Sequence, residues 1–185
     1  MFDKIINHPE LFGILCHECT ENNAKVEFDN SLLINNDLDS DKILILKPDN
    51  FYHSSRMHNP PPSPDCLILI NCTEKEYYDL YLIELKDVKD TKELKYKIVV
   101  EKFNTMIDQF FPKFEAIFNA FSYETITFYL ITTYPKGSAQ LSNDDYHSRI
   151  AGSALDAYGS RKPLKLFNKA VFIQPKSSPL TITSC

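Results

Sequence analysis

Residues 64–70, PDCLILI, and residues 78–86, YDLYLIELK, decide the fold that this sequence predicts. Each stretch contains an apolar run of the length of one strand, and a short connection joins them, so we expect them to pair as neighbours. Side chains alternate between the two faces of a strand, so Glu84 and Lys86 point to the same face. Pairing would place Asp65, at the start of the first strand, beside Glu84 and Lys86 at the end of the second.

Two carboxylates and one ammonium at a common point favour metal chemistry on phosphate esters. Carboxylate oxygens are ligands that Mg²⁺ prefers, and the ion keeps several waters, one of which a neighbouring lysine can orient. The spacing acid-x-Lys carries no weight by itself, because the chain has four such pairs between residues 84 and 95. Only Glu84-x-Lys86 ends a hydrophobic strand whose neighbour begins with an aspartate.

Hydrophobic spacing predicts the remaining elements. Four prolines between residues 53 and 64 indicate an irregular loop. We expect further strands over residues 32–34, 42–47, 125–133 and 170–173, and helices over residues 9–21, 91–121 (divided at Pro112) and 144–157.

This order of elements predicts an α/β fold, a three-layer-type sandwich with a central mixed β-sheet flanked by helices. The first three long strands can form an antiparallel meander, from which the helical segment crosses over to a parallel strand at 125–133. We expect one α/β domain over residues 1–174. Residues 175–185, rich in proline and serine, are expected to form a loose C-terminal tail.

The conjunction of Pro64-Asp65, Glu84-x-Lys86 and the helical segment that follows resembles the PD-(D/E)XK nuclease superfamily, with its restriction-endonuclease-like fold. The resemblance covers residues 64–86 by motif and about 9–133 by order of elements. It implies a metal-dependent nuclease that hydrolyses the phosphodiester bonds of nucleic acid, DNA rather than RNA. Cleavage of a duplex usually needs two active sites, so the resemblance also implies a homodimer.

The resemblance implies a role for each residue of the motif. Asp65, Glu84 and the main-chain carbonyl of Leu85 would hold one or two Mg²⁺ ions, for which Mn²⁺ can substitute. Lys86 would orient the attacking water and help to stabilise its deprotonated form. The metal would polarise the phosphoryl oxygen and neutralise the charge that builds on the leaving oxygen.

Many members of the superfamily place a further catalytic acid on their first helix. Glu18 is the best match here, because it follows Ile14 by four residues and Leu11 by seven, which puts the three on one helical face. Glu10 and Glu21 compete with it for this role.

The cysteines and the hydropathy of the chain bear on its surroundings. The five cysteines form no regular framework, so reduced thiols are expected. Cys16 and Cys19 could bind zinc together with His53 or His58, and small buried thiols in the expected helix are the alternative. No apolar run has the length of a membrane helix, and the N-terminus lacks the pattern of a secretory signal, so we expect a cytoplasmic protein without a membrane partner.

The net charge of −5 is unevenly distributed: residues 1–91 carry a balance of −9 and residues 92–185 a balance of +4. An acidic first half and a basic second half suit a metal site beside a surface that binds a polyanion, although random scatter fits as well. The basic residues that could contact phosphates, or simply be solvated, are Lys136, Arg149, Arg161, Lys162 and Lys165.

The same residues fit a second class of protein, a noncatalytic domain that keeps the fold to bind a protein or nucleic-acid partner. Asp65 would then be a loop-to-strand cap after a proline, and Glu84 and Lys86 would form a surface ion pair. The 13 Phe and 10 Tyr of the chain leave room for a protein interface.

Overall fold

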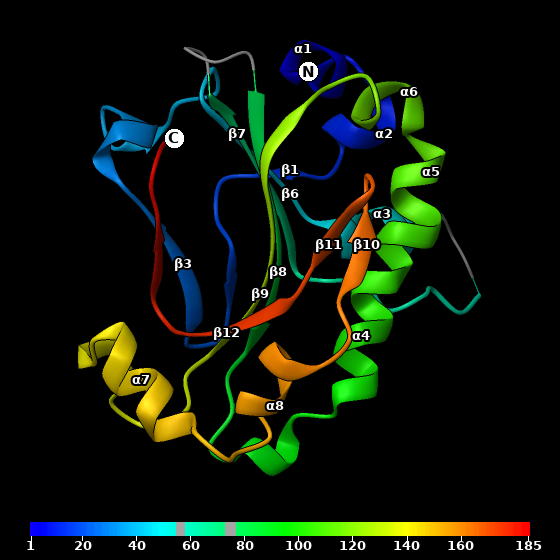
Figure 1. Ribbon diagram of the computed structural model, residues 1–185. Coiled ribbons are helices and arrows are strands. Elements are labelled where there is room, and N and C mark those ends of the chain that lie inside the picture. Colours follow the sequence, from blue (N-terminus) through cyan, green and yellow to red (C-terminus); the bar gives the residue numbers. More distant parts are fainter. Residues whose placement is uncertain (55–57, 73–76) are drawn as a thin grey trace.

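The computed structural model describes residues 1–54, 58–72 and 77–185 and has a mixed α/β fold (Figure 1). A central mixed sheet of six strands is flanked by helices, as the sequence predicted. The strand order is β1-β6-β7-β8-β9-β12. The bounds of these strands are β1 Leu15–Cys16, β6 Ile43–Leu46, β7 Cys66–Cys72, β8 Tyr77–Lys86, β9 Tyr123–Thr132 and β12 Ile173–Ser177.

The centre of the sheet confirms the predicted topology. Strands β6, β7 and β8 form an antiparallel meander, and β9 runs parallel to β8. A helical segment makes the crossover between β8 and β9, and it is divided near Pro112 as expected. Its parts are α4 Tyr96–Thr105, a π-helical turn Met106–Phe110, α5 Phe111–Lys113 and α6 Glu115–Phe118.

The alternation of side chains along the strands builds two separate cores, one on each face of the sheet. Leucines such as Leu67, Leu69 and Leu82 face the crossover helices and pack with residues that include Phe103 and Phe110. Isoleucines such as Ile45, Ile68 and Ile83 face the other way. There they pack against a second sheet, ordered β13-β3-β2, made of β13 Leu180–Ile182, β3 Ala24–Phe28 and β2 Thr20–Glu21.

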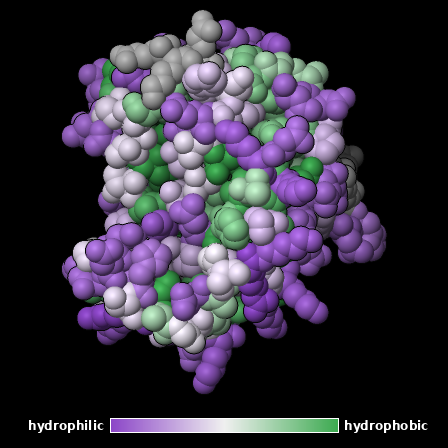
Figure 2. All heavy atoms as spheres, in the orientation of Figure 1, coloured by the Kyte–Doolittle hydropathy of each residue, from purple (hydrophilic) through white to green (hydrophobic). Residues whose placement is uncertain are grey.

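Figure 1 shows both layers, with α4, α5 and α6 on one face of the central sheet and β3 with the C-terminal segment on the other. The space-filling view in Figure 2 shows mainly hydrophilic residues over the lower part of the molecule, where α7 lies, although Tyr146 and Ile150 of that helix are buried. Other elements are α3 Pro48–Ser54, α7 Asn143–Ile150, α8 Asp156–Ser160, and the hairpins β4 Leu33–Ile34 with β5 Asp37–Leu38 and β10 Leu164–Leu166 with β11 Lys169–Val171. Short 3-10 helices are formed by Asn30–Leu32, Thr91–Glu93 and Ser138–Gln140.

The predicted helix over residues 9–21 is wrong. Helices α1 Phe2–Ile6 and α2 Pro9–Phe12 come first, and the chain then extends into β1 and β2. Leu15 and Cys16 pair with the edge of β6, so the backbone hydrogen bonds of this segment go to the sheet rather than to a helix. The apolar spacing that suggested one long helix is shared between α2, which buries Leu11, and the non-helical residues after it, which bury Ile14 and Cys19.

The predicted loose tail over residues 175–185 is also wrong. Residues 173–177 form β12, which pairs parallel with β9 at the edge of the central sheet. Strand β13 pairs parallel with β3, and Ile182 is buried between the two sheets. Leu180 and Ile182 alternate with polar residues as a half-buried strand requires, a pattern that the Pro- and Ser-rich composition obscured.

Four of the five cysteines form disulfides, which contradicts the expectation of reduced thiols. Cys19 bonds to Cys66 with both residues fully buried, and Cys72 bonds to Cys185. Cys16 is the free cysteine. Disulfides are typical of oxidising compartments, so they speak against the cytoplasmic location predicted from the sequence. Among the described residues, no helix is long and apolar enough to cross a membrane.

Candidate active site

The start of β7 and the end of β8 bring Asp65, Glu84 and Lys86 together. Cys66 pairs with Ile83, so the antiparallel register carries Asp65 opposite Glu84. Both residues lie on the face of the sheet that α4 covers, because they alternate with residues of the other core. Asp65 Oδ2 accepts a hydrogen bond of 2.7 Å from the backbone N–H of Leu85. The carboxylate of Asp65 is therefore fixed by a backbone group.

Glu84 is the centre of the cluster and has no exposed surface. Its Oε1 lies 2.7 Å from Nζ of Lys86 and 2.8 Å from Nζ of Lys102, which reaches the sheet from α4. Neither oxygen of this carboxylate has a hydrogen-bond partner among the described residues, so its observed contacts are ion pairs. A buried carboxylate needs such cationic partners, because removal from water destabilises the charge.

Lys86 also approaches a third carboxylate. Its Nζ lies 3.5 Å from Oε2 of Glu21, a residue of β2 in the second sheet. Burial alone would lower the pKa of Lys86. The negative charges of three neighbouring carboxylates outweigh burial and raise that pKa, and the largest of these effects comes from Glu84, followed by Asp65 and Glu21. Lys86 is therefore a firmly charged ammonium in the folded protein.

Asp65 is a weaker acid than an ordinary aspartate. Burial, followed by the negative charge of Glu84, raises its pKa to about 7. Lys102, the Leu85 N–H and Lys86 act in the opposite direction. A carboxyl group that exchanges its proton near neutral pH beside a second carboxylate is typical of functional sites.

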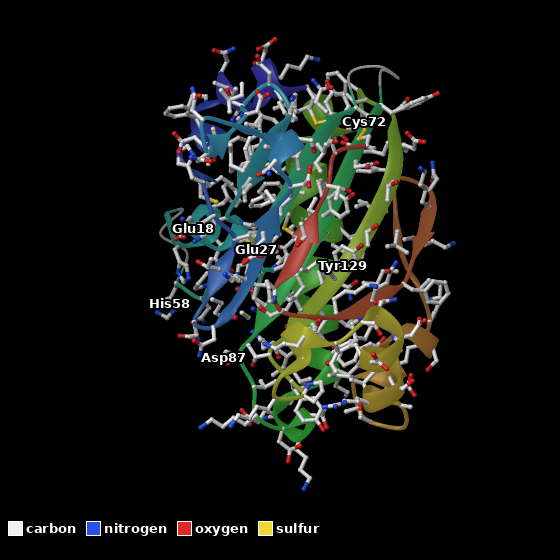
Figure 3. All side chains as sticks on the ribbon, turned by 90° about the vertical axis from the view of Figure 1, so that its left-hand side faces the viewer. Glu18, Glu27, His58, Cys72, Asp87 and Tyr129 are labelled. Atoms are coloured by element: carbon white, nitrogen blue, oxygen red, sulfur yellow. A yellow bond between two sulfur atoms is a disulfide. The ribbon has the colours of Figure 1, made fainter. Side chains whose placement is uncertain are left out.

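The structure does not bring Glu18 to this cluster. Glu18 belongs to no helix, its side chain is exposed, and its backbone carbonyl accepts a hydrogen bond from the Cys16 thiol. In Figure 3 it lies well apart from Asp87, the residue that follows Lys86. Of its two competitors, Glu10 forms an ion pair with Lys113, whereas Glu21 is the one that contacts the cluster.

Two residues of this region were not predicted. The side chain of Lys102 is only 16% exposed, although lysines are mostly exposed in folded proteins. Tyr158 of α8 is buried, its hydroxyl has no hydrogen-bond partner among the described residues, and the charges of Glu84 and Lys86 act on it. Burial is the main cause that raises the pKa of Tyr158 to about 12. Lys102 follows Val99 by three residues and precedes Met106 by four, a spacing that could have indicated the inner face.

The other candidates for substrate contact lie at the surface. His53 and His58 are exposed, and residues 55–57 between them lie outside the described part of the chain. The proposed phosphate-binding residues Lys136, Arg149, Arg161, Lys162 and Lys165 are all exposed.

The oxygen donors of this cluster fit a Mg²⁺ ion. Both oxygens of Glu84 are buried without a hydrogen-bond partner among the described residues, and the carboxylate of Asp65 is its neighbour across the two strands. Hard oxygen donors of this kind are what this ion selects. The predicted contribution of the Leu85 carbonyl stays a prediction.

The sulfur donors fit a metal less well. Zinc at Cys16 and Cys19 is excluded in this state, because Cys19 is bonded to Cys66. Cys72, Asp79 and Cys185 form another group whose ligand atoms lie within 4.8 Å of one another. The sulfurs of that group share a disulfide and are not thiolates, and thiolate is the form that binds metal.

Comparisons of the chain with protein-family models, with curated proteins and with solved structures gave no match. Function must therefore be argued from the site alone. Its chemistry combines two carboxylates that can share a divalent ion with two ammonium groups that can pair with phosphate oxygens.

Proposed function

We propose that this protein is a metal-dependent nuclease that hydrolyses phosphodiester bonds of nucleic acid, with DNA preferred to RNA. The observation that carries the proposal is the convergence of Asp65, Glu84 and Lys86 at the paired ends of β7 and β8. The antiparallel meander followed by a helical crossover to a parallel strand supports the restriction-endonuclease-like fold as the class.

Each side chain has a distinct task in the proposed reaction. Asp65 and Glu84 would hold Mg²⁺, with the Leu85 carbonyl as a further ligand. When bound, the ion would acidify a water and neutralise charge on the phosphate. Lys86 orients that water and stabilises its deprotonated form, and Glu21 keeps the Lys86 ammonium in place. Among the three N-terminal glutamates considered for the site, Glu21 is the one that contacts the cluster.

A noncatalytic binding module is the second candidate, and one observation favours it. Glu84 is completely buried and already neutralised by two lysines, an arrangement that also stabilises a fold without any metal. The two candidates differ in what the cluster does when Mg²⁺ and nucleic acid are supplied.

Cleavage assays separate the candidates. Purified protein is incubated with supercoiled plasmid, single-stranded DNA or duplex RNA, in Mg²⁺, in Mn²⁺ or in excess EDTA. We expect nicking or linearisation of the plasmid that needs the ion, and a loss of at least about 100-fold in rate for Asp65→Asn and Lys86→Met.

The matched control is Lys89→Met, which removes the exposed lysine of a second acid-x-Lys pair directly after β8. This variant should cleave at the rate of the wild type. Intact substrates under every condition, or cleavage that Asp65→Asn and Lys86→Met leave unchanged, would favour the binding module.

If the protein acts on duplex DNA, the homodimer implied by the resemblance would supply one active site for each strand. Sedimentation of the protein with and without a DNA duplex tests this separately from the chemistry.

A further inference from the structure

The ammonium of Lys102 lies beside the carboxylate of Glu84, where a metal ion bound to Glu84 would compete with it for the negative charge. Lys86 and Lys102 both contact the same atom, Oε1 of Glu84, at 2.7 Å and 2.8 Å. Both Glu84 oxygens are buried, and neither has a hydrogen-bond partner among the described residues. The cluster therefore already holds two positive charges before any ion enters it.

The two lysines differ in what they could do if a divalent ion bound Glu84. Lys86 lies on the same strand as Glu84 and has a second carboxylate, that of Glu21, within 3.5 Å. For Lys102, Glu84 is the only ion-pair partner in the part of the chain that the structure describes. A divalent ion would thus leave Lys86 a neighbouring counter-charge and leave Lys102 none.

Lys102 also acts on the second carboxylate of the site. It opposes the effect of burial on Asp65 more strongly than Lys86 does, so its charge is felt at both expected metal ligands. Its side chain keeps 16% of its surface exposed. Like charges a few ångströms apart in a poorly screened site repel strongly.

We propose that Lys102 is the built-in counter-ion of Glu84, which a divalent cation must displace, so that Lys102 sets the metal affinity of the site. This inference rests on the proposed function, since it takes Asp65 and Glu84 as the metal ligands. In the metal-free protein the pair joins α4 to β8. When the ion binds, the ammonium leaves Oε1 and turns toward solvent.

The test is calorimetric titration of Mn²⁺ into the metal-free protein at constant ionic strength. Lys102→Met removes the competing charge and keeps the length of the side chain, so it should bind Mn²⁺ on the order of ten-fold more tightly than the wild type. Lys102→Arg keeps the charge and should stay near the wild type. The matched control is Lys97→Met, which removes an exposed lysine of the same helix and should change nothing.

The outcomes separate this inference from the proposed function. Binding that is lost in Asp65→Asn but is equal or weaker in Lys102→Met overturns the role of Lys102 and leaves the metal site standing. Absence of binding in the wild type together with tight binding in Lys102→Met supports the role of Lys102. Absence of binding in both overturns both proposals.

A measurement on the wild type covers the case in which Lys102→Met does not fold. The Cε–Hε NMR signal of Lys102, assigned by its absence in Lys102→Arg, should shift during a Mg²⁺ titration as the ion pair is lost. A signal that stays unchanged while the ion binds would overturn the proposal.

Discussion

The carboxylate of Asp65 accepts the backbone N–H of Leu85 at 2.7 Å while it lies opposite Glu84 across β7 and β8. This hydrogen bond joins Asp65, which directly precedes β7, to Leu85, which follows Glu84 in β8. It holds two carboxylates on the same side of the sheet, where like charges would otherwise move apart. The negative charge of Glu84 contributes to the raised pKa of Asp65, and a cation beside both groups would favour the ionised form of Asp65.

The raised pKa of Asp65 predicts how stability depends on pH. Between pH 4 and pH 7 an unfolded chain has lost this proton while the folded protein, with a pKa of about 7, still keeps it. The unfolded state then binds fewer protons, so the free energy of unfolding contributed by Asp65 falls as pH rises through this window. Urea denaturation at several pH values should show this fall in the wild type. Asp65→Asn should show a flatter profile, and an identical slope in both proteins would contradict the assignment.

Removal of the Glu84 charge should destabilise the fold. Glu84→Gln leaves Lys86 and Lys102 without their buried anion, so we expect a loss of about 3 kcal/mol in the free energy of unfolding. The double variant Glu84→Gln/Lys102→Met should recover part of that loss, because one unpaired ammonium is gone.

The control for this change is an ion pair of similar distance at the surface. Lys25 and Glu27 lie 2.6 Å apart and are nearly half exposed (Figure 3 labels Glu27), so Glu27→Gln should cost less than about 1 kcal/mol. Urea denaturation measures both losses in the free energy of unfolding. Equal losses for Glu84→Gln and Glu27→Gln would show that the buried ion pairs of Glu84 stabilise the fold no more than a surface pair does.

The disulfides predict a simple thiol count. Protein purified under oxidising conditions and denatured without reductant should expose one titratable thiol, that of Cys16. Burial raises the pKa of this thiol, so it should react slowly in the native state. Five reactive thiols would mean that the disulfides do not form.

Loss of the Cys19–Cys66 bond should weaken the fold, because it closes a loop of 47 residues. Cys19→Ala/Cys66→Ala should lower the free energy of unfolding by about 3 to 4 kcal/mol. Cys16→Ser, which touches no disulfide, serves as the control and should stay close to the wild type.

The C-terminal strand should contribute to stability despite its composition. Ile182 is 4% exposed and packs between the two sheets, so Ile182→Ala should cost about 2 to 4 kcal/mol. The neighbouring Thr181 is exposed, and Thr181→Ala should have little effect. Thermal melting of both variants checks this. Equal melting temperatures for Ile182→Ala and Thr181→Ala would indicate that the C-terminal segment is a loose tail, as the sequence predicted.

The central strands could be predicted because their signal is local. The apolar runs at 66–71 and 78–86 are long enough to specify a buried strand, and the short link between them fixes their pairing and so the meeting of Asp65 with Glu84. The same pattern predicted the strand at 125–133. Side-chain alternation then determines which residues share a face.

The parts that could not be predicted depend on contacts distant in sequence. Leu15 and Cys16 become a strand only because β6 offers an open edge, and the pairing of Cys19 with Cys66 follows from that placement. Lys102 lies at the border of an apolar helical face, where a lysine is usually solvated. Only the buried charge of Glu84, on another element, explains why Lys102 turns inward.

The most direct test of the central claim is anomalous scattering from crystals soaked in Mn²⁺ at pH 8, where Asp65 is largely ionised. The account predicts an anomalous peak within about 2.5 Å of carboxylate oxygens from both Asp65 and Glu84, with the Lys102 ammonium moved away from Oε1. A map without a peak between these two residues at saturating Mn²⁺, or with one only beside Cys72, Asp79 and Cys185, would contradict it.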